Sequence, residues 1–271
     1  MLQLPKFDQD FMLDFLIELL NTPSPTGYTH HAITLVSKTL KQFSQLELKA
    51  TRKGALIAHW PGEARNAPRG LTAHVDTLGA MVKEIKSNGR LKLTNIGGFA
   101  WNTVEGEGLT VFTADEKEIR GSLLLAKSSS HVHAAEVNKT ERNADVMEVR
   151  LDVRTASEKE TRAFGIEVGD FVAFDPRVEL KNGFIRSRHL DDKACVANIV
   201  AAVKALHDAG LKPAQDVTLH FSNYEEVGHG ASAGFPEDMA ELLTVDMAAM
   251  GDGQTSDEFH ATLCVKDSGG P

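Results

Sequence analysis

Seven residues with acid, base or metal-binding side chains stand at four places where strand-like apolar runs end. They are His74 and Asp76, Asp191 and Asp192, Glu225 and Glu226, and Asp246. Carboxylates are costly to bury unless they are paired or bind a metal, and strand ends in a parallel sheet are partly enclosed. One imidazole and several carboxylates at one sheet edge suit a divalent cation, and a shared carboxylate would allow a two-metal hydrolase centre.

Each of these positions also has an ordinary structural interpretation. Taken alone, His74 fits a hydrogen-bonded histidine at a strand end, and Asp76 fits a turn carboxylate. Asp191 and Asp192 open a helical pattern, where an N-cap and a dipole-stabilised acid are common. The spacing of His74 and Asp76 also fits a pair in which the carboxylate accepts the free imidazole N–H and fixes the tautomer.

The last two positions have apolar surroundings. Glu225 and Glu226 follow an apolar strand-like run and precede Val227-Gly228, which is unusual for a solvated charged pair. Asp246 has an apolar residue on each side. Both features favour metal ligation over a solvated surface. The four positions together, in this order along the chain, therefore favour a metal site.

Helical and strand-like patterns alternate at both ends of the chain. Apolar spacing predicts helices over 11–20, 33–43 and 192–208 and strands over 54–60, 70–75, 217–222 and 242–245. His74 and Asp76 therefore lie at the carboxyl end of a strand, where sites gather in open α/β sheets. The alternation predicts an α/β fold with a central, mostly parallel or mixed sheet flanked by helices.

The middle of the chain has a different pattern, with short β-type runs and turns. The runs cover 83–85, 90–94, 109–113, 118–126, 146–153 and 169–174. Asn88-Gly89 and Asn182-Gly183 predict hairpin turns, and a short helix is expected from the cap Ser157 to Gly165. We therefore expect a β-rich, barrel-like domain inserted into a discontinuous α/β domain. The expected division is 78–180 for the insertion and 1–77 with 181–271 for the α/β domain.

The composition is that of an ordinary globular protein. Of the 271 residues, 42% are hydrophobic and 25% are charged, which excludes disordered and fibrous classes. A formal net charge of −9 without a basic block argues against nucleic acid or a membrane as partner. Two cysteines cannot form a disulfide framework, and no segment has the features of a signal peptide or a membrane span. We therefore expect a cytoplasmic protein.

The other candidate groups favour no second chemistry. No Gly-x-Ser-x-Gly nucleophile elbow is present, and no phosphate-loop lysine follows the glycine-rich stretches. Cys195 lies on an Ala/Val-rich helix and is expected in the core, and His189 is expected to be structural. His131 and His133 fall in the insertion and are candidates for a subunit interface. The histidines without any partner pattern are His30, His31, His207, His220 and His229.

At four places the chain resembles a known family of dinuclear metallopeptidases. The matching motifs are His74-x-Asp76, Leu190-Asp191-Asp192-Lys193, Glu225-Glu226-Val227-Gly228 and Val245-Asp246. Their order resembles the glutamyl aminopeptidase and tetrahedral aminopeptidase family, some of whose members carry endoglucanase names. The resemblance runs from about Pro23 to the last residue and implies a zinc-peptidase-like fold. The long β-rich insertion after the first motif is similar to the dimerisation domain of that family.

The resemblance implies a metal-binding role for four of the residues. His74 and Asp246 would hold one metal ion, and Glu226 would help to hold the other. Asp191 would bridge the two ions. The implied cofactors are two divalent metal ions per subunit, with zinc first and cobalt or manganese as alternatives. No organic cofactor is implied.

The resemblance also implies the reaction and the partners. Glu225 would be the general base that takes a proton from the water, and Asp76 would orient His74. The expected activity is a metal-dependent aminopeptidase that hydrolyses N-terminal residues of peptides. The expected partners are a peptide substrate and further copies of the chain, in dimers and assemblies up to a dodecamer.

The chain departs from the family pattern at two points. Thr77 follows Asp76 where many members have Glu, which affects the details of the first motif. The family's last ligand is a histidine far downstream that this sequence does not contain, and His260 is not expected to replace it. We therefore expect unequal metal positions in this centre, with at most one ion held tightly, and little or no peptide hydrolysis by this 271-residue form.

Two other functions remain open at this point. One is a catalytically silent oligomeric or regulatory relative, kept for its interfaces. The other keeps the metal site but acts on an N-acylated or amidated small peptide. Metal content and hydrolysis of an aminoacyl chromogenic substrate distinguish the first from an aminopeptidase, and substrate profiling distinguishes the second.

Overall fold

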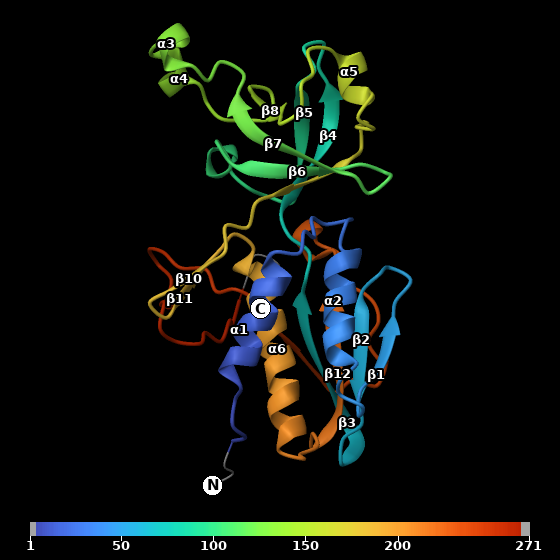
Figure 1. Ribbon diagram of the computed structural model, residues 1–271. Helices are drawn as coiled ribbons and strands as arrows, with labels where there is room; N and C mark the ends of the chain where they lie inside the picture. Colours follow the sequence, from blue (N-terminus) through green and yellow to red (C-terminus); the bar gives the residue numbers. More distant parts are fainter. Residues whose placement is uncertain (1–3, 267–271) are drawn as a thin grey trace.

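The computed structural model describes residues 4–266, which form an α/β body with a β-barrel above it (Figure 1). Residues 1–3 and 267–271, the ends of the expected α/β domain, lie outside the described residues. The long helices of the body are α1 (Gln9–Leu20), α2 (His30–Leu40) and α6 (Leu190–Asp208). Its strands are β1 (Glu47–Ala50), β2 (Leu56–Trp60), β3 (Ala64–His74), β12 (Gln215–Ser222) and β13 (Glu241–Thr244).

The sheet of the body is mixed. Its strand order is β1-β2-β12-β3-β13. Strand β2 pairs antiparallel with β1 and β12, whereas β3 pairs parallel with both β12 and β13. The expected fold class, a mostly parallel or mixed sheet flanked by helices, is confirmed. Strand β1 was not predicted, because its short, largely polar sequence carries no apolar pattern.

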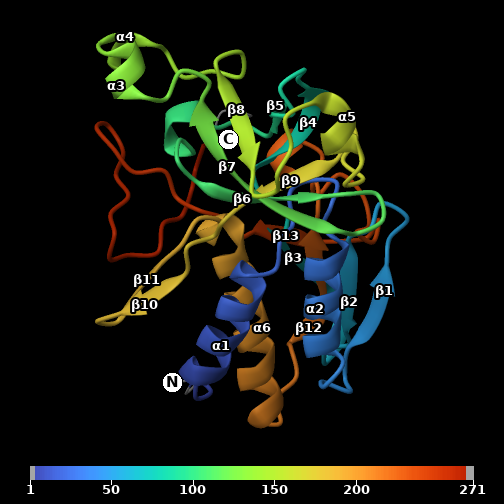
Figure 2. The same ribbon diagram turned by 45° about the horizontal axis from the view of Figure 1, so that its top comes forward.

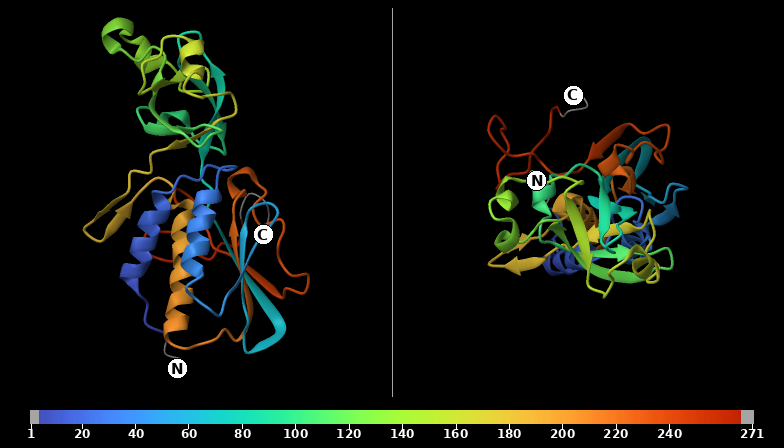
Figure 3. Two further views of the ribbon diagram at one scale, coloured as in Figure 1. Left: turned by 45° about the vertical axis from the view of Figure 1, so that its right-hand side comes forward. Right: turned by 90° about the horizontal axis from the view of Figure 1, so that it is seen from above.

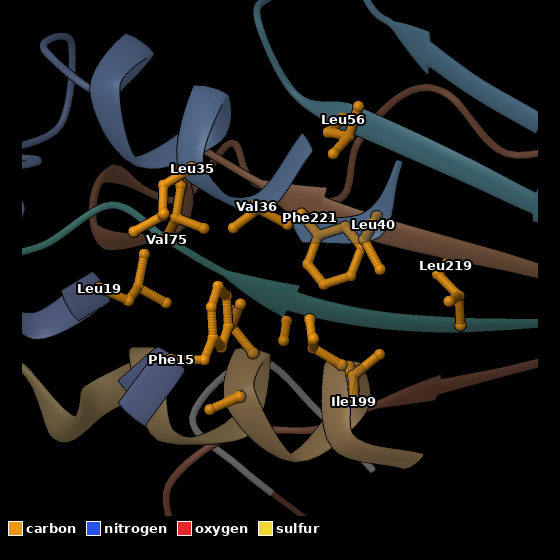
Figure 4. Packing of buried hydrophobic residues seen from close by; sticks show 14 of the residues in the cluster. Phe15, Leu19, Leu35, Val36, Leu40, Leu56, Val75, Ile199, Leu219 and Phe221 are labelled. Carbon is orange, nitrogen blue, oxygen red and sulfur yellow. The ribbon is translucent and has the colours of Figure 1, made fainter. Parts of the chain in front are cut away.

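The three long helices lie on one face of the sheet (Figure 3). Helix α1 begins where the Asp8 side chain accepts a hydrogen bond from the N–H of Phe11. The apolar faces of the helices pack with β2, β3 and β12 in one buried cluster. Phe15 of α1, Ile199 of α6 and Phe221 of β12 are among the side chains that fill this space (Figure 4). This packing determines where the ends of the helices lie relative to the ends of the strands.

The inserted segment forms a closed barrel with its own core. Its strands are β4 (Gly79–Ile85), β5 (Leu91–Ile96), β6 (Gly108–Phe112), β7 (Glu118–Leu125), β8 (Met147–Leu151) and β9 (Phe171–Phe174). They close in the order β4-β5-β8-β7-β6-β9 around a second apolar cluster. Short helices between them are η1 (Trp101–Thr103), α3 (Ser130–His133), α4 (Glu136–Lys139) and α5 (Glu158–Arg162). The expected barrel-like insertion is confirmed, as is the cap of α5, where Ser157 accepts from the N–H of Glu160.

Two stretches of chain connect the barrel to the body. The first follows β3 directly, and Thr77 in it forms an isolated parallel bridge with Pro25. The returning stretch carries a hairpin of β10 (Glu179–Lys181) and β11 (Phe184–Arg186), which projects beside the body (Figure 2). Its turn was predicted, and both turn residues, Asn182 and Gly183, have positive φ.

Within residues 4–266, no helix combines the length and the apolar character that crossing a membrane requires. Both cysteines are free: Cys195 is half-buried against the core of the body, and Cys264 is exposed.

His220 in β12 is a buried imidazole. Its side chain is 1% exposed, and its Nδ1 lies 2.9 Å from the Thr72 hydroxyl on β3. Its Nε2 has no hydrogen-bond partner among the described residues. Burial, helped by the charge of Lys53, lowers the pKa of His220 from 6.5 to about 4. The imidazole is therefore neutral in the folded protein at neutral pH.

We expect His220 to make the fold sensitive to acid. Because its folded pKa is below its unfolded pKa, the unfolded chain binds more protons between about pH 6.5 and about pH 4. The free energy of unfolding therefore falls as the pH falls through this window. At about pH 4.5 the contribution of His220 to this loss, relative to neutral pH, is about 2–3 kcal/mol.

Urea unfolding at about pH 7 and about pH 4.5 measures the effect. The variant His220→Asn should lose this part of the pH dependence, whereas His131→Asn, at an exposed position, should keep it. Identical pH dependence of the wild-type protein and His220→Asn would contradict the assignment.

Candidate metal-binding active site

The chemically active residues converge at the carboxyl edge of the sheet. Strand β3 ends at His74, which pairs with Ser222 at the end of the neighbouring parallel strand β12. The short helix η2 (Glu225–Val227) follows β12, and Asp246 follows β13 on the other side of β3. Helix α6 begins at the same edge and supplies Asp191. The parallel pairing of β3 with both neighbours therefore brings four segments distant in sequence to one place.

His74 lies at the centre of this cluster. Its Nε2 is 3.2 Å from Oδ1 of Asp191, 3.7 Å from Oε2 of Glu225 and 4.0 Å from Oδ2 of Asp246. One ligand atom from each of His74, Asp191 and Asp246 lies within 4.8 Å of the others. These three side chains can thus converge on one cation, with room for a further ligand.

The other ring nitrogen of His74 holds the imidazole in place. Nδ1 lies 2.9 Å from the backbone carbonyl oxygen of Asp76 and 3.4 Å from its carboxylate. Because a carbonyl only accepts, Nδ1 carries a hydrogen, and Nε2 is the ring nitrogen that faces the cluster and could bind a cation. Asp76 was expected to orient His74 through its carboxylate. The shorter contact is made by its main chain instead.

The carboxylate of Asp76 organises the loop beside the site. It is fully buried and accepts hydrogen bonds from the Thr26 hydroxyl at 2.7 Å and from the N–H groups of Glu225 and Glu226 at 3.1 and 3.3 Å. Burial raises the pKa of Asp76, but bonds from His74 and Thr26 outweigh it and lower the pKa. Asp76 therefore stays ionised and fixes η2, and Thr26 is a site partner that sequence reasoning missed.

The two adjacent aspartates at the start of α6 point to different places. Asp191 and Asp192 have non-helical backbone angles, and Asp191 remains partly exposed at the cluster. Asp192 is fully buried, and its Oδ2 accepts the backbone N–H of His74 at 2.9 Å. Burial raises the pKa of Asp192 to about 7. Asp192 thus ties the helix that carries Asp191 to the strand end that carries His74.

The site holds more negative than positive charge. Burial raises the pKa of Glu225 and Asp246, and it raises that of Glu226 to about 7, with Asp191 adding to the effect. Burial lowers the pKa of His74, but hydrogen bonds to carboxylates outweigh it and raise the pKa to about 11. The raised pKa values of the three carboxylates show that the positive charge of His74 alone does not compensate their negative charge. A divalent ion would provide it, so the donor set fits the metal centre expected from the sequence.

Three nearby residues have other roles. His189 precedes α6 with a φ of 73°, and burial, helped by the charge of Lys193, lowers its pKa to about 3, so it is a neutral structural residue. Lys193 is buried and donates to the carbonyl oxygen of Thr22 at 2.7 Å. His260 is exposed and pairs with Asp257 at 2.8 Å. Among residues 4–266, the cluster around His74 contains no second histidine.

Zinc binding provides a test of the three-residue cluster. Asp246→Asn should lower the affinity for one zinc equivalent, because it removes an anionic ligand while preserving the shape of the side chain. The loss should exceed the roughly 10–100-fold that is typical for residues that only orient a metal ligand. Asp238→Asn, at an exposed position outside the cluster, should keep the wild-type content. Metal analysis after equilibrium dialysis measures both. Retention of every zinc equivalent by Asp246→Asn would contradict its place among the ligands.

Comparisons with known proteins show what the chain is similar to. A family profile of M42 glutamyl aminopeptidases matches residues 54–271. YhfE of Bacillus subtilis strain 168 is 46% identical over 262 residues, which are 96% of this chain and 75% of YhfE. The chain is thus shorter than this relative.

Solved structures show the same fold. Aminopeptidase APDkam598 from the archaeon Desulfurococcus kamchatkensis superposes with a TM-score of 0.76 at 23% identity, over 91% of this chain and 66% of that one. The TET1 peptidase of Pyrococcus horikoshii, which can assemble into a tetrahedron or a large octahedral shell, gives a TM-score of 0.68 at 24% identity, over 80% of this chain and 62% of that one. The chain spans about two thirds of these structures or less.

Proposed function

Because the chain belongs to the M42 glutamyl aminopeptidase family, we propose that it is a metal-dependent aminopeptidase that removes N-terminal residues from peptides. The observation that carries the proposal is the convergence of His74, Asp191 and Asp246 beside the carboxylate of Glu225. Three metal-type ligands next to a carboxylate with a raised pKa are the components of metal-assisted hydrolysis.

The residues divide between two metal positions. His74, Asp191 and Asp246 would hold one ion, and Asp191 with Glu226 would hold a second more weakly, because two protein ligands bind a cation less tightly than three. Zinc suits this donor set, as do cobalt and manganese. Bound there, divalent cations supply Lewis acidity: they polarise a peptide carbonyl and lower the pKa of a water molecule.

Glu225 is placed to move the proton. Its backbone is fixed by the bond from its N–H to Asp76 and by the Gly228 N–H that its carbonyl accepts. Its side chain is 48% exposed, and its Oε2 lies 3.7 Å from His74 Nε2, so it reaches both the cluster and a substrate. Burial raises the pKa of Glu225, which strengthens it as a base. Oε2 would take a proton from water and return it to the leaving amine.

The charge of the site favours a free N-terminus. The carboxylates of the site, Glu226, Asp191 and Asp246 among them, outnumber the two positive charges of one bound ion, and a protonated α-amine of a peptide offsets part of the remaining negative charge. A blocked N-terminus brings no such charge. This preference is the physical reason for proposing an exopeptidase.

Hydrolysis of aminoacyl p-nitroanilides tests the function. With zinc, cobalt or manganese supplied in excess, so that the weaker position is also filled, the protein should release p-nitroaniline from substrates with a free amine and far less from their N-acetylated forms. A chelator should abolish the reaction. Absence of hydrolysis of every free-amine substrate by metal-loaded protein would refute the proposed function, and preference for the acetylated forms would favour a hydrolase of modified peptides.

The same assay tests the role of Glu225. Glu225→Gln keeps the shape but cannot accept the proton, so turnover should fall by about 10²–10⁴-fold while the metal content stays the same. Glu237→Gln, an exposed change outside the cluster, should retain the wild-type rate. An unchanged rate for Glu225→Gln would assign the base to another group.

We also propose that the chain divides into a catalytic domain, 1–77 with 181–271, and an association domain, 78–180. The barrel has its own apolar core and joins the body through two stretches only. It also exposes apolar side chains, including Val132 at 73% and Val168 at 56%. The P. horikoshii TET1 peptidase, which shares the fold, assembles into large shells. These observations support self-association through the barrel.

Removal of the barrel tests this division. A chain with residues 78–180 replaced by a short Gly/Ser linker should form a smaller particle than the intact protein in multi-angle light scattering. Most of its helical circular dichroism should be retained, because the three long helices, α1, α2 and α6, belong to the body and only short helices are removed. An unchanged number of chains per particle would contradict the association role.

A further inference from the structure

A second group of metal-type side chains lies at the junction of the body and the barrel. His30 and His31 open helix α2, and Glu116 lies in the turn between β6 and β7. One ligand atom from each lies within 4.8 Å of the others, and His30 Nε2 is 3.4 Å from Glu116 Oε1. All three residues are exposed. We propose that His30, His31 and Glu116 bind a divalent transition-metal cation that links the body to the barrel.

The donor set determines the class of cation. Two imidazoles and one carboxylate suit zinc and the neighbouring first-row divalent ions, whereas calcium and magnesium prefer oxygen ligands alone. Three protein ligands leave at least one position for water. The residues are distinct from those around His74, so this is a separate site.

Aromatic packing holds the two histidines in place. The Tyr28 ring packs edge-on against His30 at 4.8 Å and against His31 at 5.6 Å between ring centroids. Its hydroxyl lies 3.3 Å from His31 Nε2. The same ring stacks on Phe112 of the barrel at 4.6 Å. Rings that are already held in position lose less side-chain entropy when they bind a cation.

The third ligand is placed by a tight turn. Glu116 has a φ of 59°, and its N–H donates to the carbonyl of Thr113 at 2.8 Å. The Thr113 hydroxyl accepts from the N–H of Lys117 at 3.1 Å. These bonds fix the backbone of the turn between β6 and β7, from which the Glu116 carboxylate reaches His30 at the start of α2. The cation would therefore connect two parts of the fold that the chain itself joins elsewhere.

Zinc titration tests the site without any measurement of activity. In an Asp246→Asn background, which weakens the cluster around His74, the protein at about pH 8 should still bind one zinc equivalent. Addition of His30→Ala, or of Glu116→Gln, should remove that equivalent. Addition of His207→Ala, an exposed histidine at the end of α6, should leave it in place. Unchanged zinc content in both cluster variants, or equal loss in the control, would overturn the proposal.

Chemical modification of the wild-type protein provides a second measurement that needs no variant. Diethyl pyrocarbonate acylates imidazole nitrogens that are free, and peptide mass spectrometry locates the product. Zinc should lower modification of His30 and His31 several-fold and leave His207 unaffected. Equal modification of His30 and His31 with and without zinc would also overturn the proposal.

Discussion

The bond from the His74 imidazole to the carbonyl oxygen of Asp76 is the contact on which the rest of the site depends. It fixes the orientation of the ring and turns Nε2 toward Asp191 and Asp246. The same three-residue segment, from His74 to Asp76, leaves the Asp76 carboxylate buried, where it binds the main chain of the loop that carries Glu225. One strand end thus positions a ligand and the proposed base together.

The arrangement has an electrostatic cost that the protein alone does not offset. Burial raises the pKa of Glu226 to about 7 and also raises the pKa of Glu225 and Asp246. A sheet edge built only for stability would not place these groups around one imidazole. A bound cation would offset this free-energy cost, because each carboxylate would then be a ligand of the cation or lie close to its positive charge. Strain of this kind is typical of a site selected for chemistry.

Sequence reasoning predicted the parts of this site that depend on strand ends. His74, Glu225 and Asp246 each follow an apolar run, and the parallel pairing of β3 with its neighbours then brings them together. Sequence reasoning did not predict the roles of Thr26 and Asp192, because a threonine beside a turn and the second acid of a pair carry no periodic pattern.

The proximity of His30, His31 and Glu116 was missed for a related reason. His30 and His31 have no partner within their own helix, and Glu116 lies in a hairpin turn of a segment far away in the sequence. Only the closure of the barrel and its contact with α2 reveal them as neighbours. The general rule is that patterns within one element can be recognised from sequence, whereas contacts between elements need the fold.

The barrel and the site are mechanically linked even though each has its own core. The N–H of Leu78, at the entrance to the barrel, donates to Glu226 Oε1 at 3.1 Å. Gly97, just after β5, packs closely against Leu78 and Glu226. A Cβ at this position would lie 2.5 Å from the Leu78 side chain and 3.3 Å from the Glu226 carbonyl oxygen. Both contacts tie the position of Glu226 to that of the barrel. The stacking of Tyr28 on Phe112, which joins the body to the barrel near α2, adds a further point of attachment between the two parts.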